Sequence, residues 1–138
     1  MADEFEDDLT IHDSDGLLRR VPDSPCMVKY DDNLKAYRPS SLCFSDRSTC
    51  DREVSVTLER PLLDGGGKQE DAIADMPDFG LARLEAGFVR HKVAPSQKIR
   101  RAPTDKDQHH ALVIGEKDKR TKKEMAKAAS LVIKPKGY

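Results

Sequence analysis

The stretch that decides the fold is EVSVTL, residues 53–58. Its apolar side chains, at positions 54, 56 and 58, alternate with the hydroxyl side chains of Ser55 and Thr57. Because successive side chains of a strand point to opposite faces, this period of two predicts a strand with one face in the core. Pro61 ends it, since proline has no backbone N–H for a strand ladder.

Shorter segments on both sides of this strand predict its neighbours. Residues 17–21 and 26–30 are short apolar-containing segments that end at prolines or at a polar turn. Residues 97–101 suggest an edge strand, and the apolar run 110–114, ended by Gly115, suggests a buried one. We therefore expect a small mixed or antiparallel sheet.

The end of the chain predicts an amphipathic helix. Thr121 and Glu124 have the spacing of a capping box, in which each side chain accepts a hydrogen bond from the other residue's backbone N–H. One apolar stripe follows, formed by Met125, Ala128, Ala129, Val132 and Ile133, and Pro135 stops the helix. With a short helix at 69–76, and with 81–90 left open as helix or strand, the prediction is an α+β fold of two or three helices. The C-terminal helix should pack on the sheet.

Composition limits this fold to one lean domain. The chain has 138 residues, of which 37% are hydrophobic and 36% are charged. Residues 1–16 are acidic and contain no Lys or Arg, so we expect a disordered acidic arm followed by a single domain over residues 17–138.

Several classes of protein do not fit the sequence. No apolar run approaches the roughly 20 residues needed to span a bilayer, and the acidic start is unlike a secretory signal. Cys26, Cys43 and Cys50 form an odd set that suits reduced thiols, so a cytoplasmic location without a membrane partner is expected.

No motif for cofactor or metal chemistry is present. The run from Gly65 to Lys68 lacks the spacing and the following Ser or Thr of a phosphate-binding loop. Cys43, Cys50, His109 and His110 lack the short regular spacing of zinc ligands. Neither a cofactor, a metal nor a catalytic residue is therefore predicted.

Binding residues are predicted on two segments. Pro39 restricts Arg38, and the Ser40 and Ser41 hydroxyls can tie this loop to its own backbone, so that Arg38 is presented to a carboxylate or phosphate. Arg19 is a further candidate, and an internal ion pair from Arg38 to Asp46 is the alternative. The C-terminal helix should add a basic surface formed by Lys122, Lys123 and Lys127.

A set of short motifs resembles small bacterial proteins without an assigned activity. The motifs are Leu-x-Arg-Arg at 17–20, Arg-Pro-Ser-Ser-x-x-Phe at 38–44, a Ser-Val strand and His-Ala-x-Val-x-Gly at 110–115. The resemblance covers roughly residues 17 to 130. It implies a folded domain in a bacterial or phage setting and supplies no catalytic residues.

One function is predicted first, and two alternatives stay open. The first is a non-enzymatic accessory protein that binds a protein partner, because no catalytic set is recognised and the two ends carry opposite charge. Nucleic-acid binding through the basic helix is an alternative. An enzyme that handles nucleotides is a further one, since Arg19 or Arg20, Ser40, Ser41 and Glu85 occur in an order loosely similar to ADP-ribosyltransferases. In those enzymes, the resemblance implies an arginine on the NAD phosphates and a glutamate that directs transfer.

Overall fold

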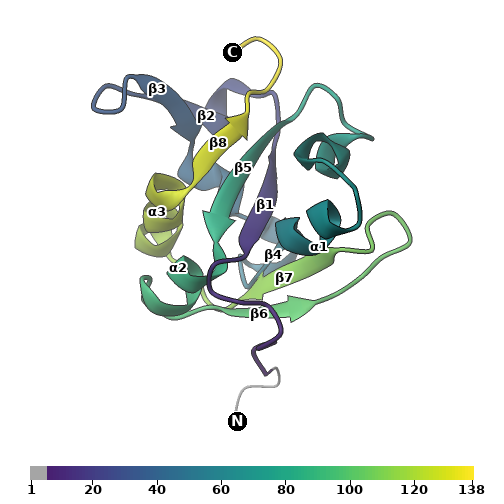
Figure 1. Cartoon of the computed structure of the whole chain (residues 1–138). Coiled ribbons are helices and arrows are strands. Elements are labelled where there is room, and N and C mark those ends of the chain that lie inside the picture. The colour runs from purple at the N-terminus through teal and green to yellow at the C-terminus, as the bar shows by residue number, and fades with distance from the viewer. Residues whose placement is uncertain (1–5) are drawn as a thin grey trace.

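A computed structural model describes residues 6–138 and confirms the α+β class (Figure 1). Six antiparallel strands form the main sheet in the order β6-β7-β4-β1-β5-β8. Their bounds are β1 Gly16–Val21, β4 Glu53–Leu58, β5 Gly80–Glu85, β6 Lys98–Arg101, β7 His110–Ile114 and β8 Ser130–Ile133. A separate hairpin pairs β2 (Val28–Asp31) with β3 (Ala36–Pro39).

The helices cover both faces of this sheet. Figure 1 shows α2 (Ala86–His91) and α3 (Lys119–Ala128) on one side of the sheet and α1 (Glu59–Asp64) on the other. Short 3-10 turns connect the elements: η1 Pro25–Met27, η2 Ser41–Phe44, η3 Arg47–Thr49 and η4 Gln69–Ile73. None of the helices within residues 6–138 is long and apolar enough to cross a membrane.

The central strand β4 has the bounds that its alternation predicts. Val54 and Val56 are buried in the main hydrophobic cluster, whereas Ser55 is only partly buried. The strand pairs with β1 on one side and β7 on the other, which explains why its backbone needs no other partner. A smaller cluster of Leu18, Ala72, Ile73 and Leu81 fills the opposite face beneath η4.

The C-terminal helix is shorter than predicted and has a different cap. The carboxylate of Asp118 is the N-cap and accepts from the backbone N–H of Thr121 at 2.8 Å. Met125 and Ala126 are buried in the main cluster, so the helix packs on the core as predicted. The predicted stripe is only partly right, because Ala126 lies outside it and Ala128, one of its members, is exposed. The helix ends at Ala128, however, and the stretch predicted as its last turn is the strand β8, paired with β5. Its apolar β-branched side chains suit a strand, and the free edge of β5 supplies hydrogen-bond partners that a helix turn would not use.

The ambiguous segment 81–90 contains both alternatives. Its first half belongs to β5 and its second half to α2, with Ala86 as the first helical residue. Leu81, Leu84 and Val89 are buried, and Phe88 is partly buried against the main cluster. The apolar residues of this segment have helix-like spacing only because a strand and a helix, both with a buried face, follow each other directly.

The acidic segment differs from the disordered arm that composition predicts. Ile11 is 1% exposed in the main cluster, and the backbone N–H of Asp8 donates to the carbonyl of Ile99 at 2.9 Å. The aspartates of this segment pair with arginines of the domain, namely Arg60, Arg90 and Arg101. Composition missed these partners because they lie 45 or more residues away along the chain. Residues 1–5 of the predicted arm lie outside the described residues.

Candidate anion-binding groove

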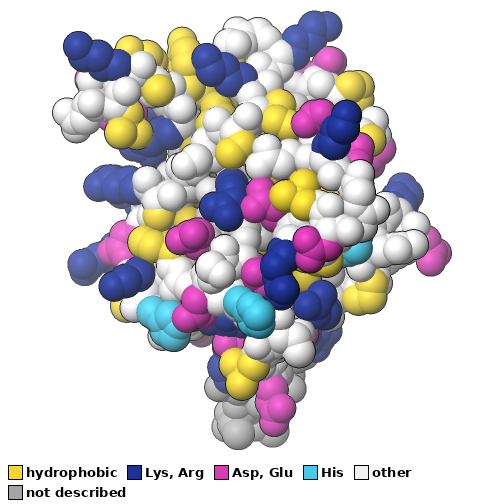
Figure 2. All heavy atoms as spheres, viewed as in Figure 1, with side chains coloured by type: hydrophobic (Ala, Val, Ile, Leu, Met, Phe, Trp, Pro, Cys, Tyr) yellow, Lys and Arg dark blue, Asp and Glu magenta, His cyan; other side chains and the backbone are white. Residues whose placement is uncertain are grey.

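The strongest candidate site is a groove between the hairpin, η2 and α3. It has a volume of about 370 Å³. Its lining consists of Lys29, Arg38, Ser40, Ser41, Leu42, Ser45, Lys119, Lys122, Lys123 and Ala126. Figure 2 shows Lys and Arg side chains along the edge of the molecule where the hairpin and α3 lie. Two groups of residues that the sequence predicts separately, the Arg38 loop and the basic helix, thus form one site.

The hairpin register places Arg38 in the groove. Arg38 is the cross-strand partner of Lys29, so both side chains lie on the same face of the hairpin. The Nε of Arg38 donates to the carboxylate of Asp31 at 3.0 Å, and its side chain is only 12% exposed. Hydrogen bonds from the backbone of Leu34, and then from Asn33 and Arg38, hold the pKa of Asp31 below its usual value. The predicted alternative partner, Asp46, is wrong: Arg38 does make an internal ion pair, but with Asp31.

The serines of the loop serve different purposes. The Ser40 hydroxyl donates to the carbonyl of Cys26 at 2.6 Å, and its backbone N–H donates to the carbonyl of Met27. These two bonds fasten the loop to the turn before β2, whereas the sequence predicts a tie to the loop's own backbone. Ser41 and Ser45 line the groove beside it and offer further hydroxyls.

The helix contributes three lysines from one face. Lys119, Lys122 and Lys123 stand at i, i+3 and i+4, the spacing of neighbours on a helix surface. The Nζ of Lys122 donates to the carboxylate of Asp51 at 3.0 Å and to the Ser45 hydroxyl at 3.2 Å. The hydrogen bond from Lys122 lowers the pKa of Asp51. Lys127, the third predicted basic residue, is exposed but does not line the groove.

The groove has an unbalanced positive charge. Arg38 and Lys122 are each held by a carboxylate. Lys29, Lys119 and Lys123 are exposed and form no ion pair with any carboxylate of residues 6–138. Among the residues that the structure describes, none that lines the groove is acidic. Three cations in a hollow with serine hydroxyls attract an anionic group.

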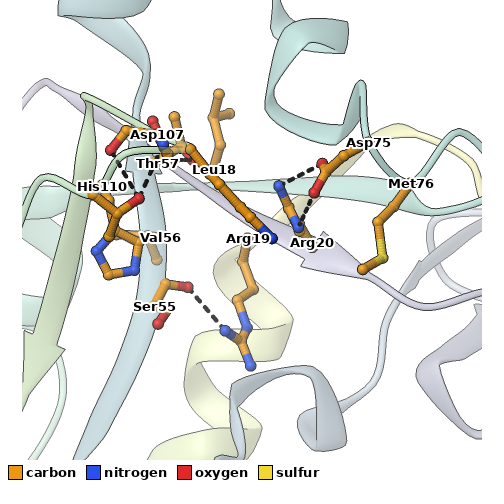
Figure 3. A pocket seen from close by; sticks show the side chains of 12 residues that line it. Leu18, Arg19, Arg20, Ser55, Val56, Thr57, Asp75, Met76, Asp107 and His110 are labelled. Atoms are coloured by element: carbon orange, nitrogen blue, oxygen red, sulfur yellow. Dashed lines mark hydrogen bonds and ion pairs between the residues drawn. The ribbon is translucent and has the colours of Figure 1, made fainter.

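Arg19 acts behind the groove rather than in it. Its guanidinium donates to the carbonyls of Cys43, Ser45 and Ser55 at 2.7, 3.3 and 2.9 Å. Burial lowers the pKa of Arg19, although these three acceptors stabilise its charge. The side chain therefore ties the η2 wall of the groove to β4, and Figure 3 shows its bond to Ser55.

Sequence reasoning missed Lys29, Lys119 and Ser45. The turn at residues 31–33 could have revealed Lys29, because a hairpin about this turn sets it opposite Arg38. Lys119 follows from the helical spacing once Asp118 is recognised as the N-cap. No local signal connects Ser45 to Lys122, which are 77 residues apart.

A second cleft lies on the other face of the sheet, where most polar groups already have partners (Figure 3). Arg20 pairs with Asp75 at 2.8 Å. The Thr57 hydroxyl donates to Asp107 at 2.6 Å, and Nδ1 of His110 lies 2.7 Å from a backbone carbonyl. With acidic and basic side chains mixed, this cleft selects less clearly for one type of ligand than the basic groove does.

The residues of the enzyme alternative do not converge. Arg19 is bound to backbone carbonyls, whereas Ser40 and Ser41 line the basic groove. Glu85 is an exposed residue at the last position of β5, where it pairs with Gly16 rather than with Arg19. Within residues 6–138 no group of three or more His, Cys, Asp or Glu side chains is placed to hold a metal ion.

Comparison with known proteins leaves the family open. No family model, curated protein or solved structure matches the chain. The resemblance of its motifs to small bacterial proteins, and the looser one to ADP-ribosyltransferases, therefore stay predictions.

Proposed function

We propose that this chain is a small non-enzymatic interaction protein whose basic groove binds an acidic segment of a protein partner. The observation that carries the proposal is the lining of the groove, to which residues 6–138 contribute five cationic side chains, three serines and no carboxylate. The two ion-paired cations, Arg38 and Lys122, keep the walls in place. The three unpaired lysines attract the carboxylates of the partner.

The lining favours a protein over a nucleic acid. Single-stranded nucleic acids are held by aromatic rings on which the bases stack, and none of the aromatic side chains in residues 6–138 lines this groove. Leu42 and Ala126 instead give it apolar contacts between the charges. A short groove of about 370 Å³ accommodates a few side chains and does not track a long phosphate backbone.

The test measures binding of a fluorescein-labelled peptide of aspartate and serine by fluorescence anisotropy. The double variant Lys119→Glu/Lys123→Glu should weaken binding at least about tenfold, because two attractive charges become repulsive. Lys127→Glu is the control, since it reverses one charge on the same helix outside the groove, half the charge change of the double variant. Binding should also fall as the salt concentration rises.

Two results would contradict the proposal. An equal loss in Lys127→Glu would show a general attraction to positive charge instead of a site. A fluorescein-labelled oligo-dT strand that binds more tightly than the peptide, and that is lost in the double variant, would support the nucleic-acid alternative.

A further inference from the structure

The basic groove adjoins a second cavity of different character. Leu42 and Ser45 line both, and the second cavity has a volume of about 360 Å³. Its other lining residues are Arg19, Arg20, Pro22, Met27, Cys43 and Phe79. A segment that binds in the groove can therefore reach this cavity by passing over Leu42.

The cavity offers mainly apolar contacts. Pro22, Met27 and Phe79 are each partly exposed, so their apolar atoms are accessible. The two arginines of its lining are already engaged, Arg19 with three backbone carbonyls and Arg20 with Asp75 and the carbonyl of Ala72. Their charges consequently add little attraction for another anion at this end.

Leu42 stands at the junction with 49% of its surface exposed. The next residues, Cys43 and Phe44, are buried in the core and hold η2 firmly. An exposed leucine on a rigid turn, between a charged groove and an apolar cavity, is suited to contact an apolar side chain of a bound segment.

We propose that the second cavity takes a large aliphatic or aromatic anchor side chain of the same partner segment, an inference that rests on the proposed function of the groove. The recognised segment is then a run of acidic residues beside one apolar residue. The lysines attract the acidic run and set its position, and burial of the anchor against Leu42 supplies the selectivity between acidic sequences.

The experiment compares fluorescein-labelled acidic peptides of equal charge. One set carries a single phenylalanine at each position in turn, and the reference peptide has alanine instead. The wild-type protein should prefer one position of the phenylalanine by about fivefold or more over the reference, which corresponds to burial of part of an aromatic ring. Leu42→Ala should abolish this preference, so that no phenylalanine peptide binds the variant more tightly than the alanine peptide does.

Leu63→Ala is the matched control, because Leu63 is a leucine of similar exposure (44%) on α1, outside both cavities. It should keep the preference. If the alanine peptide binds and the groove variants weaken it, but no position of the phenylalanine improves binding, the anchor inference is overturned and the proposed function stands. A preference that persists in Leu42→Ala also overturns the anchor inference. If no acidic peptide binds, both fail together.

Discussion

The acidic N-terminal segment and the basic groove are both rich in charge, but they use it in opposite ways. Asp7, Asp8, Asp13 and Asp15 all contact arginines, most of them across more than 70 residues of sequence. In the groove, three lysines have no carboxylate partner within residues 6–138. The first set of charges holds the fold together, and the second is available to a ligand.

Arg90 is the clearest example of a charge that holds the fold together. Its side chain is 6% exposed and donates to the carbonyls of Ile11 and Asp8 at 2.6 and 2.9 Å, as well as to Asp7 and Asp13. Such a buried guanidinium is stable because carboxylates and backbone carbonyls surround its charge. The comparison shows that partners, rather than the density of charge along the sequence, separate structural from binding residues.

The largest effect should come from removing this arginine. Arg90→Ala leaves the buried carbonyls and the nearby aspartates without their donor, and we expect the free energy of unfolding to fall by about 3–5 kcal/mol. Chemical denaturation monitored by circular dichroism measures this loss. If the variant is as stable as wild type, the acidic segment is not part of the folded domain.

Truncating Ile11, the buried apolar residue of the acidic segment, should lower the free energy of unfolding by nearly as much. Ile11 is 1% exposed in the main cluster, so Ile11→Ala creates a cavity and should cost about 3 kcal/mol. Leu9→Ala provides the control, because Leu9 is 80% exposed and should change stability little. Similar denaturation midpoints for both variants would argue that the segment does not pack as described.

Lys117 is a lysine that, unlike those of the groove, is buried and bonded within the fold. It is 6% exposed, and its Nζ donates to the carbonyls of Val113, Gly115, Asp51 and Arg52. Burial lowers its pKa to about 8, against 10.5 as the ordinary value. Between these two pH values the unfolded chain binds more protons than the folded one, so the contribution of Lys117 to stability rises with pH.

The measurement is the difference in free energy of unfolding between wild type and Lys117→Met from pH 7 to 10.5. Above pH 8 the free energy of unfolding of wild type should rise relative to that of the variant by up to about 1.4 kcal/mol per pH unit. Below pH 8 the difference between the two should stay constant. Because both proteins share all other titrating groups, their effects cancel in the difference. A difference that is flat over the whole range would mean that the pKa of Lys117 is the same in both states.

The smallest effect on stability should belong to the groove. Lys123 is exposed and has no carboxylate partner in the described part of the chain. Lys123→Ala should therefore change the free energy of unfolding by less than about 0.5 kcal/mol while weakening binding of the acidic peptide. Thermal melts and anisotropy on the same preparation measure both. A loss of stability comparable to that of Arg90→Ala would remove the distinction between the two regions.

Local patterns in the sequence determined the α+β class and several elements. The alternation at 53–58 and the apolar run at 110–114 correspond to β4 and β7 with the predicted bounds, because period-two burial is a property of the strand itself. Arg38, Ser40, Lys122 and Lys123 were also identified as candidates, since their chemistry is visible residue by residue. These features need only neighbours along the chain.

Tertiary structure alone decided the rest. Whether Asp7 or Lys123 has an ion-pair partner depends on arginines and carboxylates that are distant in sequence. The change from helix to strand after Ala128 depends on another distant segment, because the edge of β5 supplies the hydrogen bonds of β8. The convergence of the hairpin and α3 into one groove is of the same kind. Periodicity and composition describe local chain geometry, whereas partners and cavities come from long-range packing, which no segment encodes by itself.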